Sequence, residues 1–221
     1  ITMIFLISFI EIPENNVIEK KESFTFSIDS FRSDLKEVGN IDKRIQDIIC
    51  ATSKGLIELD SNNNIIPALA ESVDVRDNGL EYSFNLKEDM YWSDGRTILA
   101  KDVLSFFREI ITEENEDSIK GLLNVYGAKD YRNNKNTTFS ETVGIYIEDN
   151  NIVFRLNSRD DNFIKELSKV QYRLRNNVAL WEDIKSNYSN LIYSGNYSIE
   201  NITNEEIILK RLLSAISLLI L

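Results

Sequence analysis

Hydrophobic and polar residues alternate most regularly between residues 79 and 111. Four apolar side chains separated by polar ones show the period of a half-buried strand: Leu80, Tyr82, Phe84 and Leu86. Further along, apolar residues recur at helical spacing: Val103, Leu104, Phe106, Phe107, Ile110 and Ile111. Residues 91–95, YWSDG, lie between the two patterns and end on a glycine that can adopt positive φ. The pattern therefore predicts a strand, a tryptophan-bearing turn and a helix, with another turn at residues 77–79.

The remaining pattern predicts short elements of both kinds. Strands are expected at 23–29, 56–59, 65–66, 72–76, 143–147, 152–156, 191–199 and 205–210, several of them in hairpins. Helices are expected from residue 41 to the glycine at 55 and near residues 163–170 and 181–188. This mixture indicates an α/β fold, and strands of mixed direction are expected.

Both ends of the chain are unusually apolar. Residues 1–10 form a ten-residue apolar run, about half of what a membrane-spanning helix needs. Its length suits the apolar part of a secretory signal, although a buried strand is the alternative. Residues 11–22 are interpreted as a linker, and residues 212–221 as an apolar tail.

Charge and composition narrow the class of protein. The formal net charge of −11 argues against nucleic-acid binding and against docking on an anionic membrane. With no histidine and one cysteine, neither an internal disulfide nor a Cys-His zinc site can form. Cys50 follows two isoleucines of the first helix, so a buried, inert thiol is expected.

No arrangement typical of an enzyme is found. A Ser-His-Asp or Cys-His arrangement is impossible without histidine, and no phosphate-binding glycine motif occurs. Carboxylate pairs remain possible, so a carboxylate-based hydrolase is an alternative, but 36 acidic residues make any such pair unselective. Four acids within residues 113–117 lack the spacing of a calcium loop and are interpreted as a solvated helix end. No catalytic residue, metal site or cofactor is predicted.

Three residues at or just after the turn have predicted roles. Trp92 could stack on a ligand or anchor the strand–turn–helix corner, and the structural role is favoured. Asp94 is expected to accept backbone N–H bonds in that turn. Leu99 stands just before the predicted helix, where a threonine hydroxyl would act as a cap.

Residues 82–107, YSFNLKEDMYWSDGRTILAKDVLSFF, resemble the signature of extracellular solute-binding protein family 5, the peptide- and nickel-binding components of ABC importers. Residues 55–58 and 66–72 match upstream, and residues 143–156 and 194–197 match more weakly downstream. The resemblance covers roughly residues 23 to 211.

The resemblance implies a periplasmic-binding-protein-like fold of type II. Residues 23–55 and 158–211 would form the first lobe, and residues 56–157 an inserted mixed α/β subdomain. Members of the family are roughly twice as long, so the second lobe is expected to be missing and the chain to be an N-terminal fragment.

The resemblance also implies a ligand site in a cleft between two lobes. The positions that match on the first lobe are Ser30, Phe31 and Arg32, together with Tyr126. A tyrosine on a helix face is the alternative for Tyr126. The acidic partner of the ligand's amino group would lie in the second lobe.

The implied function is capture of oligopeptides outside the cytoplasm, in the periplasm or at the outer face of the membrane. The expected partners are a peptide ligand and the permease subunits of an ABC transporter, with a monomeric full-length protein. A nickel- or haem-binding relative is the alternative within the family, and a relic that binds nothing is a further one. Without a second lobe, peptide binding by these residues is expected to be weak.

Overall fold

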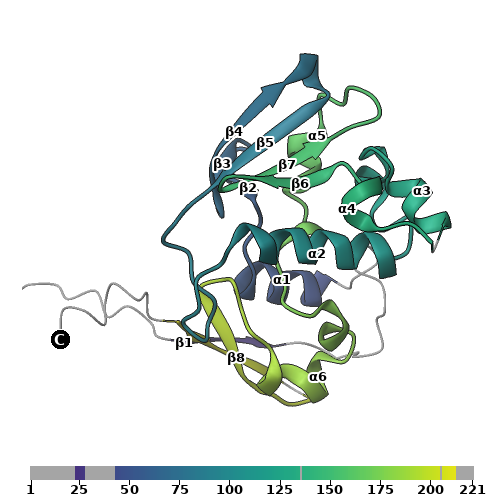
Figure 1. The fold of residues 1–221 in the computed structure, drawn as a ribbon. Helices are drawn as coiled ribbons and strands as arrows, with labels where there is room; N and C mark the ends of the chain where they lie inside the picture. The colour runs from purple at the N-terminus through teal and green to yellow at the C-terminus, as the bar shows by residue number, and fades with distance from the viewer. Residues whose placement is uncertain (1–22, 28–42, 135, 205, 213–221) are drawn as a thin grey trace, which may run out of the picture.

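The computed structural model describes residues 23–27, 43–134, 136–204 and 206–212. Two larger sheets and a small hairpin surround a long central helix, α2 (Ala100–Glu113) (Figure 1). The predicted signal-like segment and apolar tail lie outside the described residues.

A four-stranded sheet packs on one side of α2. Its strands are β4 (Ala70–Arg76), β5 (Glu81–Leu86), β7 (Asn151–Arg155) and β6 (Ile145–Glu148), in that order. The turn between β4 and β5 has positive φ at Asp77, Asn78 and Gly79, so the predicted hairpin is confirmed. Aromatic residues on the inner face pack toward α2 and α5 (Phe163–Leu167), with Phe107 and Phe154 ring centroids 4.9 Å apart.

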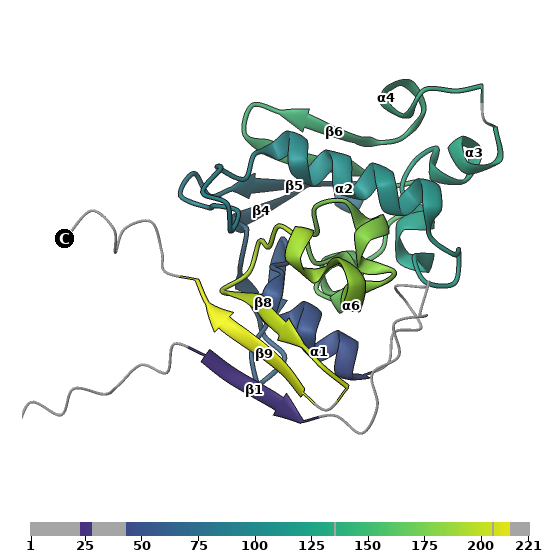
Figure 2. The same cartoon turned by 90° about the horizontal axis from the view of Figure 1, so that it is seen from below.

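A three-stranded sheet lies on the other side of the helices. It consists of β1 (Ser23–Ser27), β9 (Glu206–Arg211) and β8 (Tyr197–Ile202), beside α1 (Lys43–Thr52) (Figure 2). The hairpin of β2 (Ile57–Leu59) and β3 (Ile65–Pro67) forms a separate two-stranded sheet.

Short helices fill the connections. In chain order these are η2 (Lys120–Asn124), α3 (Ala128–Asn133), α4 (Phe139–Thr142), η3 (Val170–Tyr172), η4 (Val178–Trp181), α6 (Ile184–Asn187) and η5 (Tyr188–Asn190). The proposed division into a lobe and an inserted subdomain stays a prediction.

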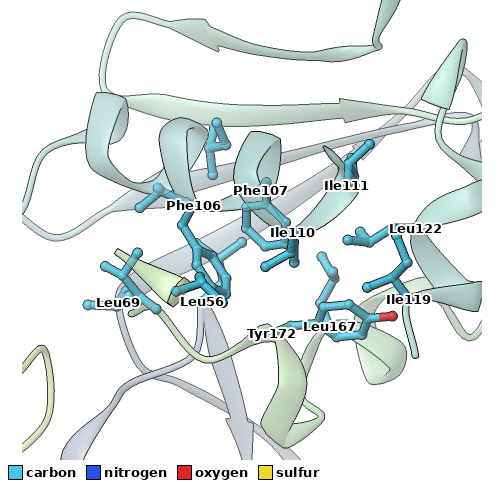
Figure 3. Packing of buried hydrophobic residues seen from close by; sticks show 14 of the residues in the cluster. Leu56, Leu69, Phe106, Phe107, Ile110, Ile111, Ile119, Leu122, Leu167 and Tyr172 are labelled. Atoms are coloured by element: carbon cyan, nitrogen blue, oxygen red, sulfur yellow. The ribbon is translucent and has the colours of Figure 1, made fainter. Parts of the chain in front are cut away.

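The core is centred on the buried face of α2. Phe106, Phe107, Ile110 and Ile111 point toward residues from several other segments (Figure 3). The partners in this cluster include Leu56, Leu69, Ile119, Leu122, Leu167 and Tyr172. The apolar spacing that predicted the helix is therefore the spacing that fills the core.

The expectation of mixed strand directions is wrong. Every strand ladder among the described residues is antiparallel. Most of these strands are joined by tight turns or short connections, which suit antiparallel pairing.

The expectation for Cys50 is also wrong, because its side chain is exposed. The buried face of α1 carries Ile48 and Ile49, and Cys50 lies one residue further around the helix. Partial burial of the thiol still raises the pKa of Cys50 above its usual 9.0, and this disfavours the reactive thiolate.

The acidic end of α2 is only partly solvated. Glu114 is buried, contrary to the expectation for residues 113–117, although its acidic neighbours are exposed. Arg175 is buried nearby, and the charges of Glu114 and Glu109 favour its protonated form. A tertiary partner 61 residues away cannot be inferred from the local run of acids.

Candidate functional site

The predicted site residues fall into two groups. Ser30, Phe31 and Arg32 lie outside the described residues. Tyr126 is described, and 47% of its surface is exposed. It lies in the turn between η2 and α3, so the alternative of a helix-face tyrosine is wrong.

Three backbone hydrogen bonds fix the position of Tyr126. Its N–H donates to the carbonyl of Arg155 over 2.8 Å, and its own carbonyl accepts from the N–H of Gly144 over 2.8 Å. The N–H of Arg155 donates to the carbonyl of Gly144 over 2.7 Å. The three residues thus hold one another in a closed ring of bonds.

Two glycines allow this close approach. A Cβ atom on Gly144 would lie 2.9 Å from the carbonyl oxygen of Arg155 and 3.0 Å from the Cβ of Tyr126. Gly127 has φ of +69°, and a Cβ there would overlap the carbonyl of Thr142. The exposed tyrosine therefore stands on a tightly packed backbone.

The side chain of Arg155 completes this site. Its guanidinium carbon lies 4.1 Å from the centroid of the Tyr126 ring, within the range of a cation–π contact. Sequence reasoning did not single out Arg155. The alternation of residues in the strand at 152–156 indicates that Arg155 points outward. It does not indicate which side chain Arg155 contacts.

The tryptophan-bearing turn has a structural role. Trp92 is 4% exposed, and its Nε1–H donates to the carboxylate of Asp102 over 3.3 Å. The same carboxylate oxygen accepts the backbone N–H of Leu99 over 2.9 Å. Asp94 accepts the N–H of Arg96 over 3.1 Å. The favoured interpretation of Trp92 as an anchor is confirmed.

The turn also contacts the segment before β8. The N–H of Ser93 donates to the carbonyl of Tyr193 over 2.8 Å, and the N–H of Tyr193 donates to Ser93 Oγ over 3.0 Å. Gly195 donates to the carbonyl of Thr52 over 2.9 Å. The turn within residues 82–107 therefore lies against the segment that leads into residues 194–197.

A buried arginine lies in the same half of the protein. Arg175 is 2% exposed, and it donates to the carbonyls of Gln171 over 2.8 Å and Arg173 over 3.3 Å. Burial lowers the pKa of Arg175 to about 10, while Glu114 and Glu109 oppose the shift. We interpret this residue as part of the core.

Within the described ranges, no group of three or more His, Cys, Asp or Glu side chains is arranged to hold a metal ion. In the same part of the chain, no helix has the length and apolar character needed to span a bilayer.

The fold has known counterparts. A crystal structure of a periplasmic oligopeptide-binding protein from Borrelia burgdorferi superposes with a TM-score of 0.70 at 21% identity, covering 84% of this chain and 38% of that one. The described arrangement is therefore part of a type II periplasmic-binding fold.

The sequence identifies the family. Residues 64–212 match the model of the bacterial extracellular solute-binding proteins, family 5 Middle, so the chain belongs to this family. A dipeptide-binding protein of Lactococcus lactis is 28% identical over 148 residues, which are 66% of this chain and 26% of that protein. The oligopeptide-binding protein AliB of Streptococcus pneumoniae is 33% identical over 112 residues, which are 48% of this chain and 17% of that protein. The matched region thus spans about a quarter or less of these relatives.

Proposed function

We propose that this chain is part of an extracytoplasmic substrate-binding protein that captures oligopeptides for an ABC importer. The observation that carries the proposal is the family match over residues 64–212, together with relatives named for dipeptide and oligopeptide binding. The partners would be the peptide and the permease subunits of the transporter. The full-length protein would act as a monomer, in the periplasm or at the outer face of the membrane, as a binder and not as an enzyme.

Tyr126 is the described residue that we assign to the peptide site. Its ring is exposed while its backbone is fixed by Gly144 and Arg155, so it offers contact area at a small cost in conformational entropy. Ser30, Phe31 and Arg32 are assigned to the same site by family resemblance. Because the matched region covers 26% of the Lactococcus lactis relative, further contacts would come from sequence corresponding to the rest of that protein.

A solution NMR titration tests this assignment. The 221-residue chain, labelled with ¹⁵N, would be titrated with millimolar mixed tri- and tetrapeptides. We expect amide shifts concentrated at residues 126, 127 and 144. Tyr126→Ala should reduce these shifts, whereas Tyr91→Ala, which truncates another exposed tyrosine at the tryptophan-bearing turn, should leave them unchanged.

Shifts confined to other regions would contradict the role of Tyr126 but not peptide capture. If no resonance responds to any peptide at millimolar concentration, the proposed function of this region is wrong.

A further inference from the structure

We infer that Arg155 is an anion-binding residue of the peptide site and that it takes a carboxylate of the ligand. This inference rests on the proposed function and adds to it a residue and a chemical class of group. It starts from the cation–π contact between the Arg155 guanidinium and the Tyr126 ring, whose centroid lies 4.1 Å from the guanidinium carbon.

The first step concerns the charge of Arg155. The chain carries 36 acidic and 25 basic residues, so an exposed arginine has many candidate partners. Other arginines of the chain pair with a carboxylate: Arg76 lies 2.7 Å from Glu148, and Arg159 lies 2.7 Å from Asp161. Arg155 is exposed and has no carboxylate within 4.0 Å among the described residues.

The absence of an ion pair at Arg155 has a local reason. Its directly opposite neighbour in the sheet is Glu81, the natural partner for an arginine at that position. The carboxylate of Glu81 instead accepts the hydroxyl of Tyr146 over 2.9 Å and lies 3.7 Å from Arg76. The carboxylate of Glu81 therefore interacts with Tyr146 and Arg76, whereas the side chain of Arg155 contacts the ring of Tyr126.

The second step concerns the availability of the guanidinium. Its carbon lies 4.1 Å from the centroid of the Tyr126 ring, and no carboxylate pairs with it among the described residues, so its N–H donors remain available to a ligand. The backbone beneath is held by the ring of bonds through Gly144, where a side chain would press on both Tyr126 and Arg155. A guanidinium that lies beside an exposed aromatic ring and has no carboxylate partner is available to bind an anion.

The third step identifies that anion. A guanidinium edge matches a carboxylate in bidentate geometry, and peptides carry carboxylates at the C-terminus and on Asp and Glu side chains. The peptide C-terminus and an acidic side chain would present the same group, a carboxylate. The ring of Tyr126 would contact the part of the ligand next to that carboxylate.

The test uses three matched peptides on the ¹⁵N-labelled 221-residue chain: Ala-Ala-Ala with a free C-terminus, the same peptide as its C-terminal amide, and Ala-Asp-Ala amide. The Nε–H resonance of Arg155 is followed with the amides of residues 126 and 144. We expect both carboxylate-bearing peptides to shift these signals, with the amide of Ala-Ala-Ala bound roughly three- to tenfold more weakly.

Arg155→Gln should reduce the affinity for the carboxylate-bearing peptides to that of the amide. Arg96→Gln is the control, since Arg96 is paired with Asp94 and lies at a different corner of the molecule. A response to the free acid alone would assign the C-terminus as the source of the carboxylate, and a response to Ala-Asp-Ala amide alone would assign the side chain. Either result supports the inference.

Equal binding of all three peptides would overturn the inference while leaving peptide capture intact. The same conclusion follows if Arg155→Gln binds the carboxylate-bearing peptides as wild type does. The comparison of free acid and amide is made on the unmodified chain, so it decides the question even if the variant fails to fold. If no peptide shifts any resonance, the proposed function fails as well.

Discussion

At the scale of single residues, periodicity predicted burial well where a side chain lies on the buried face of its element. Phe106, Phe107 and Trp92 are buried as expected. The local pattern did not predict the exposure of Cys50, because this residue lies just beside the apolar face of its helix. It did not predict the burial of Glu114 either, because that burial depends on a segment distant in the sequence. For the same reason Arg155 was not found: its contact with Tyr126 joins residues 29 positions apart.

A glycine next to β8 gives a prediction at this scale. A Cβ on Gly195 would lie 2.6 Å from the backbone nitrogen of Ser53 and 2.8 Å from the carbonyl oxygen of Thr52, neither of which can move without shifting α1. Gly195→Ala should therefore reduce the free energy of unfolding by roughly 3 kcal/mol, at the upper end for overpacking. Urea unfolding followed by circular dichroism would measure it.

Gly95→Ala is the matched control. Gly95 has φ of +87° but open space around its Cα, so only the backbone strain of about 1–2 kcal/mol applies. The account of a close-packed junction is wrong if the alanine at 195 costs no more than the alanine at 95.

At the scale of elements, the sequence predicted most strands and helices, because apolar spacing and turn residues are local signals. The hairpins formed by β2 and β3, β4 and β5, and β6 and β7 all occur at the predicted places. Strand directions were poorly predicted, since tertiary packing decides them.

The start of α2 gives a prediction at this scale. Leu99 is the N-cap residue, and Asp102 at the third helical position already accepts the N–H of Leu99. The leucine side chain, 42% exposed, cannot accept a bond in return. Leu99→Thr should complete a capping box and stabilise the protein by roughly 0.5–2 kcal/mol.

Thermal and urea unfolding would measure this gain. Leu99→Val, which has a similar shape to threonine without its hydroxyl, is the control and should give no such increase. Equal stability of the threonine and valine variants would show that capping does not limit the helix.

At the scale of the whole molecule, the family resemblance predicted the class of fold, because a long signature of residues encodes one junction of turn, helix and strand. The ligand site was predicted less completely, since three of its four proposed residues lie outside the described part of the chain and the fourth is a single exposed tyrosine. The lobe and subdomain boundaries remain predictions.

The pH dependence of stability follows from composition and burial. With no histidine in 221 residues, the free energy of unfolding should be nearly constant from pH 6 to 8. Burial raises the pKa values of Tyr172 and Tyr193 above 10.0 and that of Cys50 above 9.0, so the unfolded chain loses these protons first. Arg175, with its pKa lowered to about 10, acts in the opposite direction above that pH.

Burial also raises the pKa values of Tyr82 and Tyr146 and lowers that of Lys54. Five raised groups thus outnumber two lowered ones, so stability should fall above pH 9 by roughly 1.4 kcal/mol per net proton and pH unit. Urea unfolding at intervals from pH 6 to 10.5 would measure the slope. A rise in stability over the alkaline range would contradict the burial of these tyrosines.

The central claim is that these residues supply one part of a peptide site whose other part lies in sequence corresponding to the rest of the longer relatives. Charge-assisted hydrogen bonds contribute roughly 1.5–3 kcal/mol each, and every 1.4 kcal/mol is about tenfold in affinity. A peptide that lacks several such contacts stays half solvated and should bind in the millimolar range.

Isothermal titration calorimetry of the 221-residue chain with a mixed peptide library tests this claim most directly. The account predicts a dissociation constant in the millimolar range, because a site that lacks several charge-assisted contacts loses several factors of ten in affinity. A micromolar dissociation constant at one peptide per chain would contradict it, since these residues would then carry a complete site.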